Sequence, residues 1–386
     1  MDTPIFENSQ LFVRSIGEIT DIVQKEMYKF EDLGGDFLTL RPEGTAPICR
    51  AYLEHGMHNL PQPVRLYYFC PIFRYERPQA GRLRQHNQFG LEAIGDKDPS
   101  IDAEVIEIGW RLLKQLGLTK LSLLINSIGD EECRPNYLSN LKKYYLGKIK
   151  AICQECNNRL QRNPMRLLDC KNPNCQETIA EAPHNIDYLC ISCKSHWEQF
   201  LTYLKLLKLP YNIDHRLVRG FDYYTRTVFE IQPPIEGAMS TIMGGGRYDG
   251  LINQLGGNPT PAMGFGSGIE RIILNLERQN IKIPANEKIQ TVVAYIGEAS
   301  KDNAITIASE LRQKGNSVIT APANRSLKSQ MRYASSLSST YVIIIGDQEL
   351  KNRTVVLRDM ISGHQKEIPV DAIDEHIRTS EPTNIE

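Results

Sequence analysis

Short apolar runs separated by polar turns fill the chain from residue 1 to about 125. Residues 67–69 and 88–94 alternate with a period of two, which is typical of antiparallel strands. Residues 121–125 predict a buried strand. A helix is predicted between Asp98, a good cap, and Gly117, because apolar residues recur there at helical spacing. The members of this apolar stripe are Ile101, Val105, Ile108, Leu112 and Leu116.

The pattern changes near residue 129 and returns near residue 211. This stretch is rich in Asn, Lys and Arg and holds seven of the nine cysteines, so we expect an inserted, mostly helical module. From Arg216 onward strands and glycines return and lead to a helix at about 268–276. Residues 284–288 are predicted to be a linker. Strands and helices then alternate, which predicts a small separate α/β domain, at 291–296, 302–313, 317–320, 326–334, 341–345 and 354–357.

Composition places the chain among ordinary globular proteins. Of 386 residues, 41% are hydrophobic and 24% are charged, which excludes a disordered, collagenous or coiled-coil chain. The length indicates two or three domains. The formal net charge of -1 excludes a general basic coat for nucleic acid but leaves room for local basic patches. We see no signal peptide and no apolar run that could span a bilayer, so a cytoplasmic protein without a membrane partner is expected.

The nine cysteines require an explanation other than disulfides, because their number is odd and cytosolic thiols stay reduced. Two CxxC pairs have the spacing of metal knuckles: Cys153 with Cys156, and Cys190 with Cys193. Four thiolates on a structural Zn²⁺ would stabilise an insertion with little core of its own, with Cys170 and Cys175 as alternative ligands. Buried free thiols are the competing interpretation. The other three are expected to be small core residues: Cys49, Cys70 and Cys133.

Three arginines stand in strand-like or glycine-rich contexts: Arg74 in Phe-Arg-Tyr-Glu, Arg219 in Val-Arg-Gly-Phe-Asp-Tyr-Tyr, and Arg271 in Gly-Ile-Glu-Arg. A guanidinium is always charged, and its paired donors suit phosphate oxygens. Three of them converging on one triphosphate could replace a P-loop, whose signature the sequence lacks. A single arginine more often forms a surface salt bridge, so the prediction rests on the set. Residues 264–268 resemble a glycine-rich loop, although close strand–helix packing is the simpler explanation.

The chain resembles the histidyl-tRNA synthetases, a family of class II aminoacyl-tRNA synthetases, over nearly its whole length. Residues 73–92 are similar to class II motif 2, and residues 264–271 are similar to motif 3. Two segments are similar to the family's two histidine-specific motifs: residues 217–224, Leu-Val-Arg-Gly-Phe-Asp-Tyr-Tyr, and residues 244–250, Gly-Gly-Gly-Arg-Tyr-Asp-Gly. The presence of both motifs in this order is the most specific part of the match. Residues 41–46 match the family as well.

The resemblance implies an α+β fold: the antiparallel sheet of class II synthetases flanked by helices, with a helical insertion and a C-terminal α/β anticodon-binding domain. It implies a histidine–tRNA ligase that joins histidine to ATP and passes the histidyl group to the 3′ end of tRNA(His). ATP and Mg²⁺ are the implied cofactors. In the first step a carboxylate meets the α-phosphate, so catalysis consists of positioning and charge neutralisation.

The resemblance also assigns residues to the two substrates. Arg74 would hold the α-phosphate, and Arg219 would bridge it to the substrate carboxylate in place of a metal ion; both are the implied catalytic residues. The implied ATP-binding residues are Arg74, Glu76, Arg82 and Arg271. The implied histidine-binding residues are Glu43 and Thr45 for the ammonium group, Gln88 nearby, Glu92, Tyr223 and Tyr224 around the imidazole, and Arg219. His86 is expected to be structural or to face solvent.

The C-terminal unit carries basic residues that could meet phosphates and unstacked anticodon bases or could form a solvated helix face. They are Arg325, Lys328, Arg332, Arg353 and Arg358.

The implied domains are a catalytic domain in two parts, 1–128 and 212–283, a helical insertion with the cysteine cluster at 129–211, and an anticodon-binding domain at 288–386. The chain is expected to be shortened at its N-terminus, because only the end of class II motif 1, around Pro4, is present. Since that motif forms part of the family's dimer interface, the expected homodimer depends on it.

Two alternatives remain. A non-catalytic paralogue that regulates ATP phosphoribosyltransferase in histidine biosynthesis shares the fold. It typically loses the histidine-specific motif and the anticodon-binding domain, whereas Arg219, Tyr223 and Tyr224 are present here. A zinc-dependent RNA-binding module without catalysis would explain the cysteines but not the set of arginines.

Overall fold

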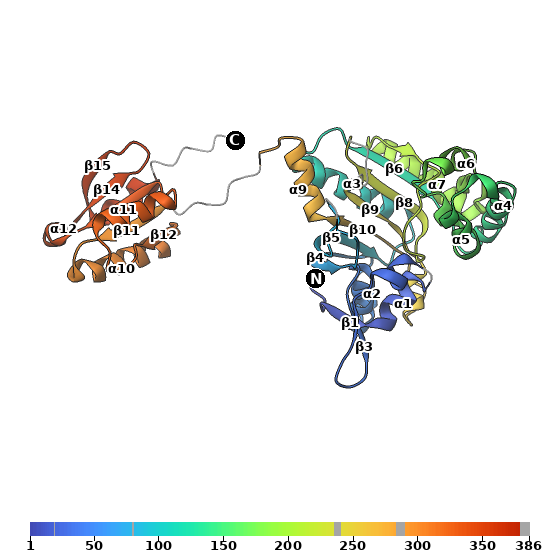
Figure 1. The fold of residues 1–386 in the computed structure, drawn as a ribbon, viewed down its shortest axis with the longest axis horizontal. Helices are drawn as coiled ribbons and strands as arrows, with labels where there is room; N and C mark the ends of the chain where they lie inside the picture. Colours follow the sequence, from blue (N-terminus) through green and yellow to red (C-terminus); the bar gives the residue numbers. More distant parts are fainter. Residues whose placement is uncertain (19, 79–80, 235–240, 283–289, 379–386) are drawn as a thin grey trace. The chain divides into compact units, whose positions relative to one another are not determined.

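The computed structural model describes residues 1–18, 20–78, 81–234, 241–282 and 290–378. The chain divides into two compact units, Met1–Lys282 and Ile283–Glu386, each with its own sheet and core (Figure 1). The linker predicted at 284–288 lies outside the described residues. The finer division into domains 1–128, 129–211, 212–283 and 288–386 stays a prediction. No helix within the described ranges is long and apolar enough to cross a membrane.

A seven-stranded sheet forms the centre of the first unit, in the order β4-β5-β10-β9-β8-β6-β7. Neighbouring strands are antiparallel except β6 and β7, which run parallel. The long pair β4–β5 confirms the strands predicted around 67–69 and 88–94. The seven strands are β4 (Val64–Phe73), β5 (Gln85–Ile94), β6 (Ser122–Ser127), β7 (Asn212–Ile213), β8 (Thr225–Gln232), β9 (Met243–Arg247) and β10 (Ala262–Gly268).

Glycines let the central strands approach closely and leave space on one face of the sheet. Residues 264–268 form strand β10, hydrogen-bonded on both sides, so the glycine-rich loop considered from the sequence is wrong. A Cβ on Gly245 would collide with the carbonyl oxygen of Gly264, and a Cβ on Gly264 would collide with the Glu92 carboxylate. These positions therefore need glycine because of the neighbouring strands.

Helix α3 (Pro99–Gln115) begins where the sequence indicated, with the Asp98 carboxylate accepting a hydrogen bond from the Ser100 amide. Its buried face differs from the predicted stripe, because Ile108 and Leu116 are exposed. Gly109 faces the sheet and a Cβ there would meet the Met243 sulfur, so the helix presents its small residue to the sheet. The buried residues are Ile101, Asp102, Ala103, Val105, Ile106, Gly109 and Leu113.

The N-terminal segment is more helical than its β-like runs predicted. Helix α2 lacks a clear apolar stripe because it is buried on most sides, which explains why periodicity missed it. A three-stranded antiparallel sheet, β1-β3-β2, lies beside α1 and α2. The elements are β1 (Phe6–Asn8), α1 (Ser9–Ile16), the π-helical η1 (Ile22–Glu26), β2 (Lys29–Glu31), β3 (Phe37–Leu40), α2 (Thr45–Glu54) and η2 (Met57–Asn59). Two further helices are α8 (Leu251–Gln254) and α9 (Ile269–Arg278).

Between β6 and β7 the chain is helical and builds a small core of its own. These helices group at one side of the first unit, next to β6 and β8 (Figure 1). The longest, α7, packs against α3. The elements are α4 (Arg134–Leu146), η3 (Ile149–Ala151), α5 (Gln154–Arg162), η4 (Pro164–Leu167), η5 (Pro173–Cys175), α6 (Gln176–Ala180), η6 (Asn185–Tyr188) and α7 (Ile191–Leu206).

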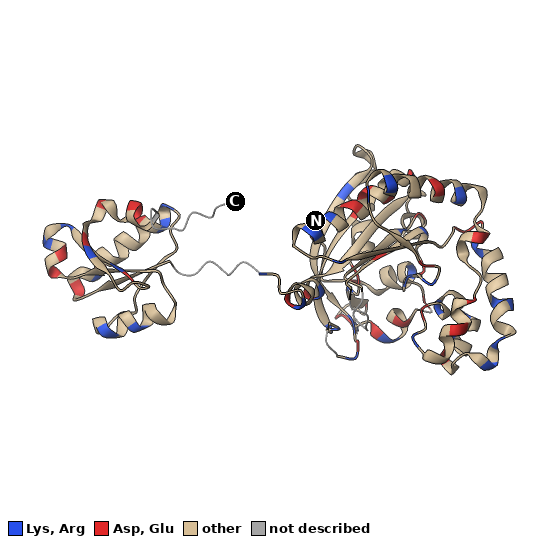
Figure 2. Ribbon diagram, turned by 90° about the horizontal axis from the view of Figure 1, so that it is seen from above, with Lys and Arg blue, Asp and Glu red and all other residues tan. Residues whose placement is uncertain are grey.

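The second unit is a five-stranded sheet in the order β12-β11-β13-β14-β15, parallel in its first three strands and antiparallel in the rest. Helices cover both faces, and charged residues of both signs lie on them (Figure 2). All predicted elements occur; α12, β15 and α13 were missed. The elements are β11 (Thr291–Tyr295), α10 (Glu298–Gln313), β12 (Val318–Thr320), α11 (Leu327–Ser336), β13 (Tyr341–Ile345), α12 (Asp347–Asn352), β14 (Thr354–Asp359), β15 (Gln365–Pro369), η7 (Val370–Ala372) and α13 (Ile373–Arg378).

Candidate active site

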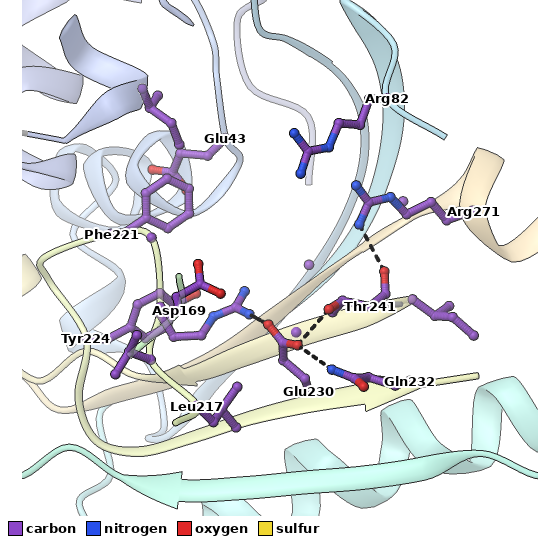
Figure 3. A pocket seen from close by; sticks show the side chains of 18 of the residues that line it. Glu43, Arg82, Asp169, Leu217, Phe221, Tyr224, Glu230, Gln232, Thr241 and Arg271 are labelled. Atoms are coloured by element: carbon purple, nitrogen blue, oxygen red, sulfur yellow. Dashed lines mark hydrogen bonds and ion pairs between the residues drawn. The ribbon is translucent and has the colours of Figure 1, made fainter. Parts of the chain in front are cut away.

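A cavity of about 790 Å³ lies over the central strands of the first unit, and Arg74, Arg219 and Arg271 all line it. They come from three distant segments: the end of β4, the loop before β8, and the first turn of α9. Figure 3 shows Arg82 and Arg271 on one side of this space, Phe221 and Tyr224 on the opposite side, and Glu230 between them. The convergence of arginines predicted from the sequence is therefore present in the structure.

Arg219 lines the cavity and contacts a carboxylate and an aromatic ring. Its Nη1 donates to Glu230 Oε1 at 2.5 Å, and its guanidinium carbon lies 5.6 Å from the centre of the Tyr224 ring. Glu230 also accepts hydrogen bonds from Gln232 Nε2 at 3.0 Å and from Thr241 Oγ1 at 2.6 Å (Figure 3). Sequence reasoning missed Glu230, because a lone glutamate on a strand gives no sign of the partner that it meets.

Arg74 and Arg271 are positioned by backbone carbonyls and not by carboxylates. Arg74 Nε donates to the carbonyl of Pro42 at 2.8 Å, and its guanidinium lies over the Phe221 ring at 5.7 Å. Arg271 donates from Nε to Gly81 at 3.2 Å and from Nη1 to Thr241 at 3.0 Å. Among the described residues neither forms an ion pair, so both leave positive charge facing the cavity.

The motif 2 loop adds further groups to the same wall. Arg82 Nε lies 3.5 Å from Glu76 Oε2, and both residues line the cavity. His86 lines it too and is half-buried; burial, with the charge of Arg74, lowers the pKa of this imidazole to about 4. The histidine is therefore neutral at physiological pH. Burial is the larger cause of this low pKa; the charges of Arg74 and Arg271 act in the same direction, and those of Glu270 and Glu76 oppose it.

Glu43 and Thr45 lie together at another part of the cavity wall. The Glu43 carboxylate accepts hydrogen bonds from the backbone amides of Thr45 at 2.7 Å and Ala46 at 2.8 Å, at the N-terminus of α2. Burial raises the pKa of this carboxyl group despite these bonds. The pair offers a carboxylate and a hydroxyl, which suits an ammonium group.

Glu92 lies beneath the cavity and is fully buried. Its Oε1 accepts a hydrogen bond from Thr45 Oγ1 at 2.8 Å, and its Oε2 accepts one from the Tyr248 hydroxyl at 2.5 Å. Burial raises the pKa of Glu92 to about 8. The residues that line the cavity do not include Glu92, so it stands behind Thr45. Tyr248, in the second histidine-specific motif, was missed as a site residue.

Aromatic side chains form a further wall. The rings of Phe221 and Tyr223 stack with centroids 5.2 Å apart, and the rings of Tyr223 and Tyr224 are tilted with centroids 4.6 Å apart. Burial, with the neighbouring charge of Glu43, raises the pKa of the Tyr223 phenol well above its usual range. Gln88 lies over Gly266, and its Oε1 accepts a hydrogen bond from Tyr68 at 3.2 Å. This part of the cavity therefore combines aromatic rings with a few polar groups.

A buried ionic network supports the sheet away from the cavity. Asp102 accepts hydrogen bonds from Arg247 Nε at 2.8 Å and lies 2.8 Å from His196 Nε2, joining α3, β9 and α7. Arg247 also contacts Asp249 at 3.1 Å. Arg247, inside the second histidine-specific motif, therefore has a structural contact and does not reach the cavity lining.

The cysteines of the helical insertion form two groups, not one. Cys153 caps helix α5 and Cys190 caps helix α7, so the two CxxC pairs lie on different helices. The structure therefore corrects the predicted set of Cys153, Cys156, Cys190 and Cys193, and Cys133 is no ordinary core residue. The first group is Cys153, Cys156, Cys170 and Cys175, and the second is Asp130, Cys133, Cys190 and Cys193.

The first group has the geometry of a four-thiolate site. Cys153 Sγ lies 3.9 Å from Cys170 Sγ, and Cys156 Sγ lies 3.9 Å from Cys175 Sγ. A tetrahedral zinc ion with Zn–S bonds of about 2.3 Å places its sulfurs about 3.8 Å apart. Cys170 also lines the cavity, so this group borders it.

Comparison with known proteins agrees with this geometry. Residues 2–272 match the family model of the histidyl-tRNA synthetases, and residues 290–380 match that of the anticodon binding domain. A histidine–tRNA ligase of Dehalococcoides mccartyi is 57% identical over 372 residues, which cover 96% of this chain and 89% of that protein. One from Caldanaerobacter subterraneus is 47% identical over 376 residues, covering 97% and 90%. The apo structure of S. aureus histidyl-tRNA synthetase superposes with a TM-score of 0.80 at 38% identity, covering 98% of this chain and 90% of that one.

Proposed function

The chain belongs to the histidyl-tRNA synthetase family and is a histidine–tRNA ligase, and we propose that the arginine-lined cavity of its first unit is where histidine is activated. The observation that carries this assignment is the convergence of Arg74, Arg219 and Arg271 on one cavity that also holds Glu43 and Thr45. Three guanidinium groups there offset most of the charge of a triphosphate, and the Glu43 carboxylate suits the ammonium group of an amino acid.

In the first step one carboxylate oxygen of histidine attacks the α-phosphorus of ATP. The bond from that phosphorus to the bridging oxygen of pyrophosphate breaks, and histidyl-adenylate forms. Arg219, fixed by Glu230, would lie between the carboxylate and the α-phosphate, and Arg74 would hold the same phosphate. Arg271 and Arg82 would bind the outer phosphates. Such preorganised cations stabilise the charge that develops in the transition state without further reorganisation.

Mg²⁺ accompanies ATP in this family of reactions and prefers oxygen ligands, of which phosphates and waters supply most. Glu76 and Glu230 are carboxylates that line the cavity on the phosphate side, and Glu76 Oε2 is buried and makes no hydrogen bond within the described part of the chain. Glu76 therefore fits a bound Mg²⁺, which would neutralise charge on the outer phosphates, whereas both oxygens of Glu230 already accept hydrogen bonds.

Histidine itself would be recognised by the walls opposite the phosphate site. We assign the ammonium group to Glu43 and Thr45, with Gln88 nearby. The imidazole would lie against Tyr223 and Tyr224, and the place of both rings in the cavity lining supports this assignment. Glu92, which the resemblance assigns to the imidazole, would act from behind the cavity lining by positioning Thr45 and Tyr248, from which it accepts hydrogen bonds. A site that hydrogen-bonds its substrate rejects amino acids lacking those groups by roughly 10⁴-fold.

The histidyl group would pass to tRNA(His), whose anticodon we assign to the second unit. Arg325, Lys328, Arg332 and Arg353 are exposed there, and Arg358 is half-buried. Lys328 and Arg332 are four residues apart on α11 and share a face of that helix. The cytoplasm, where tRNA and ATP meet, is the compartment that we propose.

We further propose that two chains form a homodimer. Large apolar side chains are exposed on the three-stranded sheet and on β4, the edge strand of the main sheet, which is the property of an interaction surface. These residues are Ile5, Phe6, Phe30, Leu33, Phe37, Tyr67 and Phe69.

Structural Zn²⁺ at Cys153, Cys156, Cys170 and Cys175 completes the proposal. The backbone amides of Cys153 and Asn172 donate to Cys175 Sγ at 3.2 Å and Cys170 Sγ at 3.4 Å, and such bonds stabilise thiolate ligands. The metal would fix the loop at 168–171, which lines the cavity.

Histidine-dependent exchange of pyrophosphate into ATP tests the assignment. Arg219→Ala is expected to reduce the exchange rate by about 10²–10³-fold, the usual effect of removing one preorganised donor. Arg65→Ala is the matched control, because Arg65 is an exposed arginine that pairs with Glu104 outside the cavity. Exchange that survives Arg219→Ala undiminished would refute the proposed role of this residue. Absence of exchange in the folded wild-type chain would instead favour the regulatory paralogue.

A further inference from the structure

The second group of metal-ligating side chains lies where the helical insertion meets the main sheet. The four potential ligand atoms of Asp130, Cys133, Cys190 and Cys193 lie within 4.8 Å of one another. Asp130 Oδ1 is 3.5 Å from Cys133 Sγ and 3.9 Å from Cys190 Sγ. Tetrahedral zinc with bonds of about 2.0 Å to oxygen and 2.3 Å to sulfur requires separations of about 3.5–3.8 Å. The separation between Asp130 Oδ1 and Cys133 Sγ matches this value, and the remaining ligand atoms lie within 4.8 Å of one another.

The elements that carry these side chains hold them in place. Asp130 and Cys133 lie between β6 and α4, Cys190 caps α7, and Cys193 lies in the first turn of α7. The backbone amide of Asp130 donates to Cys133 Sγ at 3.4 Å, and that of Cys193 donates to Cys190 Sγ at 3.4 Å. Amide donors to sulfur favour the thiolate form, which is the form that binds metal.

Arg226 orients the carboxylate. Its Nη2 donates to Asp130 Oδ2 at 3.3 Å and to Ser192 Oγ at 3.1 Å. Asp130 Oδ1 faces the sulfurs of Cys133 and Cys190 and also accepts hydrogen bonds from the backbone amides of Glu132 at 3.1 Å and Cys133 at 3.4 Å. Arg226 adopts a left-handed backbone conformation with φ 48°, at the irregularity where β8 pairs with β9. Such strain in a non-glycine residue is retained where the surrounding contacts require it. The guanidinium also offsets the negative charge of a site with three thiolates and one carboxylate.

The donor set selects the class of metal. Three thiolates and one carboxylate suit the borderline-soft Zn²⁺, whereas Mg²⁺ and Ca²⁺ require oxygen ligands throughout.

We propose that Asp130, Cys133, Cys190 and Cys193 bind a structural Zn²⁺ ion, distinct from the site at Cys153, Cys156, Cys170 and Cys175. This ion joins the beginning of the insertion to α7. It also supports the histidine site, because Arg134, next to Cys133, donates from Nη2 to the backbone carbonyls of Tyr224 at 2.7 Å and Gly129 at 3.2 Å. The metal content of the chain does not depend on the proposed catalytic function.

Zinc per chain, measured on the full-length protein after dialysis against metal-free buffer, tests the proposal. The wild type is expected to hold two zinc ions, Cys193→Ala one, Cys156→Ala one, and the double variant none. Cys156→Ala is the matched control, since it removes a buried CxxC thiol from the other group. The proposal is overturned when Cys193→Ala binds as much zinc as the wild type. If zinc is lost in Cys193→Ala but not in Cys156→Ala, the proposal is upheld and the site at Cys153, Cys156, Cys170 and Cys175 is refuted.

Asp130→Asn keeps the test decisive if Cys193→Ala does not fold. This change retains the side-chain volume and removes the anionic ligand. In the Cys156→Ala background, which leaves only the second site, competition with a zinc chelator is expected to show at least ~10-fold weaker binding for Asp130→Asn. Unchanged zinc affinity in this folded variant would exclude Asp130 from the site and overturn the proposal.

Discussion

The guanidinium of Arg219 lies directly over Gly244, where an added Cβ would stand 2.6 Å from Arg219 Nη1. The glycine of the second histidine-specific motif thus makes room for the arginine of the first. Because the obstructing atoms belong to the flexible end of a side chain, a substitution at Gly244 should move Arg219 and leave the strand intact.

Gly244→Ala is therefore expected to reduce histidine-dependent pyrophosphate exchange by about 10²-fold or more, close to the effect of losing Arg219 itself. The far-ultraviolet circular dichroism should stay unchanged. Gly250→Ala is the control, because an added Cβ there meets no atom closer than 3.8 Å. Full activity of Gly244→Ala would show that Arg219 need not occupy this position.

Glu92 makes the stability of the first unit dependent on pH. Its pKa is raised by burial to about 8 in the folded state, while the ordinary value is 4.5. Between these values the folded state binds more protons than the unfolded state, so the free energy of unfolding falls as pH rises. From pH 6 to 8.5 the loss attributable to Glu92 is on the order of 2 kcal/mol.

Glu92→Gln, which cannot ionise, should remove that part of the pH dependence. Urea unfolding followed by tryptophan fluorescence is the measurement, because the two tryptophans, Trp110 and Trp197, both pack in the core of the first unit. An equal loss of stability in the variant and the wild type over this pH range would contradict the raised pKa.

The buried pair of Asp102 and Arg247 is expected to be essential for stability. Asp102→Ala leaves the fully buried Arg247 without its nearest carboxylate, and removing one partner of a buried pair costs about 3–5 kcal/mol. Glu104→Ala, on the same helix, removes an exposed partner of Arg65 and should cost less than about 1 kcal/mol. Urea midpoints of the two variants would check this difference, and similar midpoints would refute it.

The face of α11 that carries Lys328 and Arg332 is expected to bind tRNA. The double change Lys328→Ala and Arg332→Ala should weaken tRNA binding by about 10-fold and reduce its salt dependence, because two phosphate contacts would be lost. Pyrophosphate exchange, which needs no tRNA, should be unaffected.

Lys301→Ala provides the control, since Lys301 lies on α10, which covers the opposite face of the second sheet. Filter binding at two salt concentrations distinguishes the variants. Unaltered tRNA affinity in the double variant would place the anticodon contacts elsewhere on the unit.

Features that depend on neighbours in the sequence were predicted well. The β4–β5 strands, the cap at Asp98 and the α/β alternation after residue 290 follow from periodicity and local hydrogen bonding, which a few adjacent residues define. The helix α2 was missed because burial on most sides erased its apolar stripe.

The arginine, tyrosine and CxxC motifs could be recognised in the sequence because the chemistry of each is contained in a few consecutive residues. Only the tertiary structure decided which distant residues these motifs meet: Glu230 beside Arg219, Tyr248 beside Glu92, and Asp130 beside Cys190. It also separated the two CxxC pairs, since each follows its own helix. Such partners are set by the packing of strands and helices that are far apart along the chain. This packing cannot be predicted from the few residues that neighbour each motif.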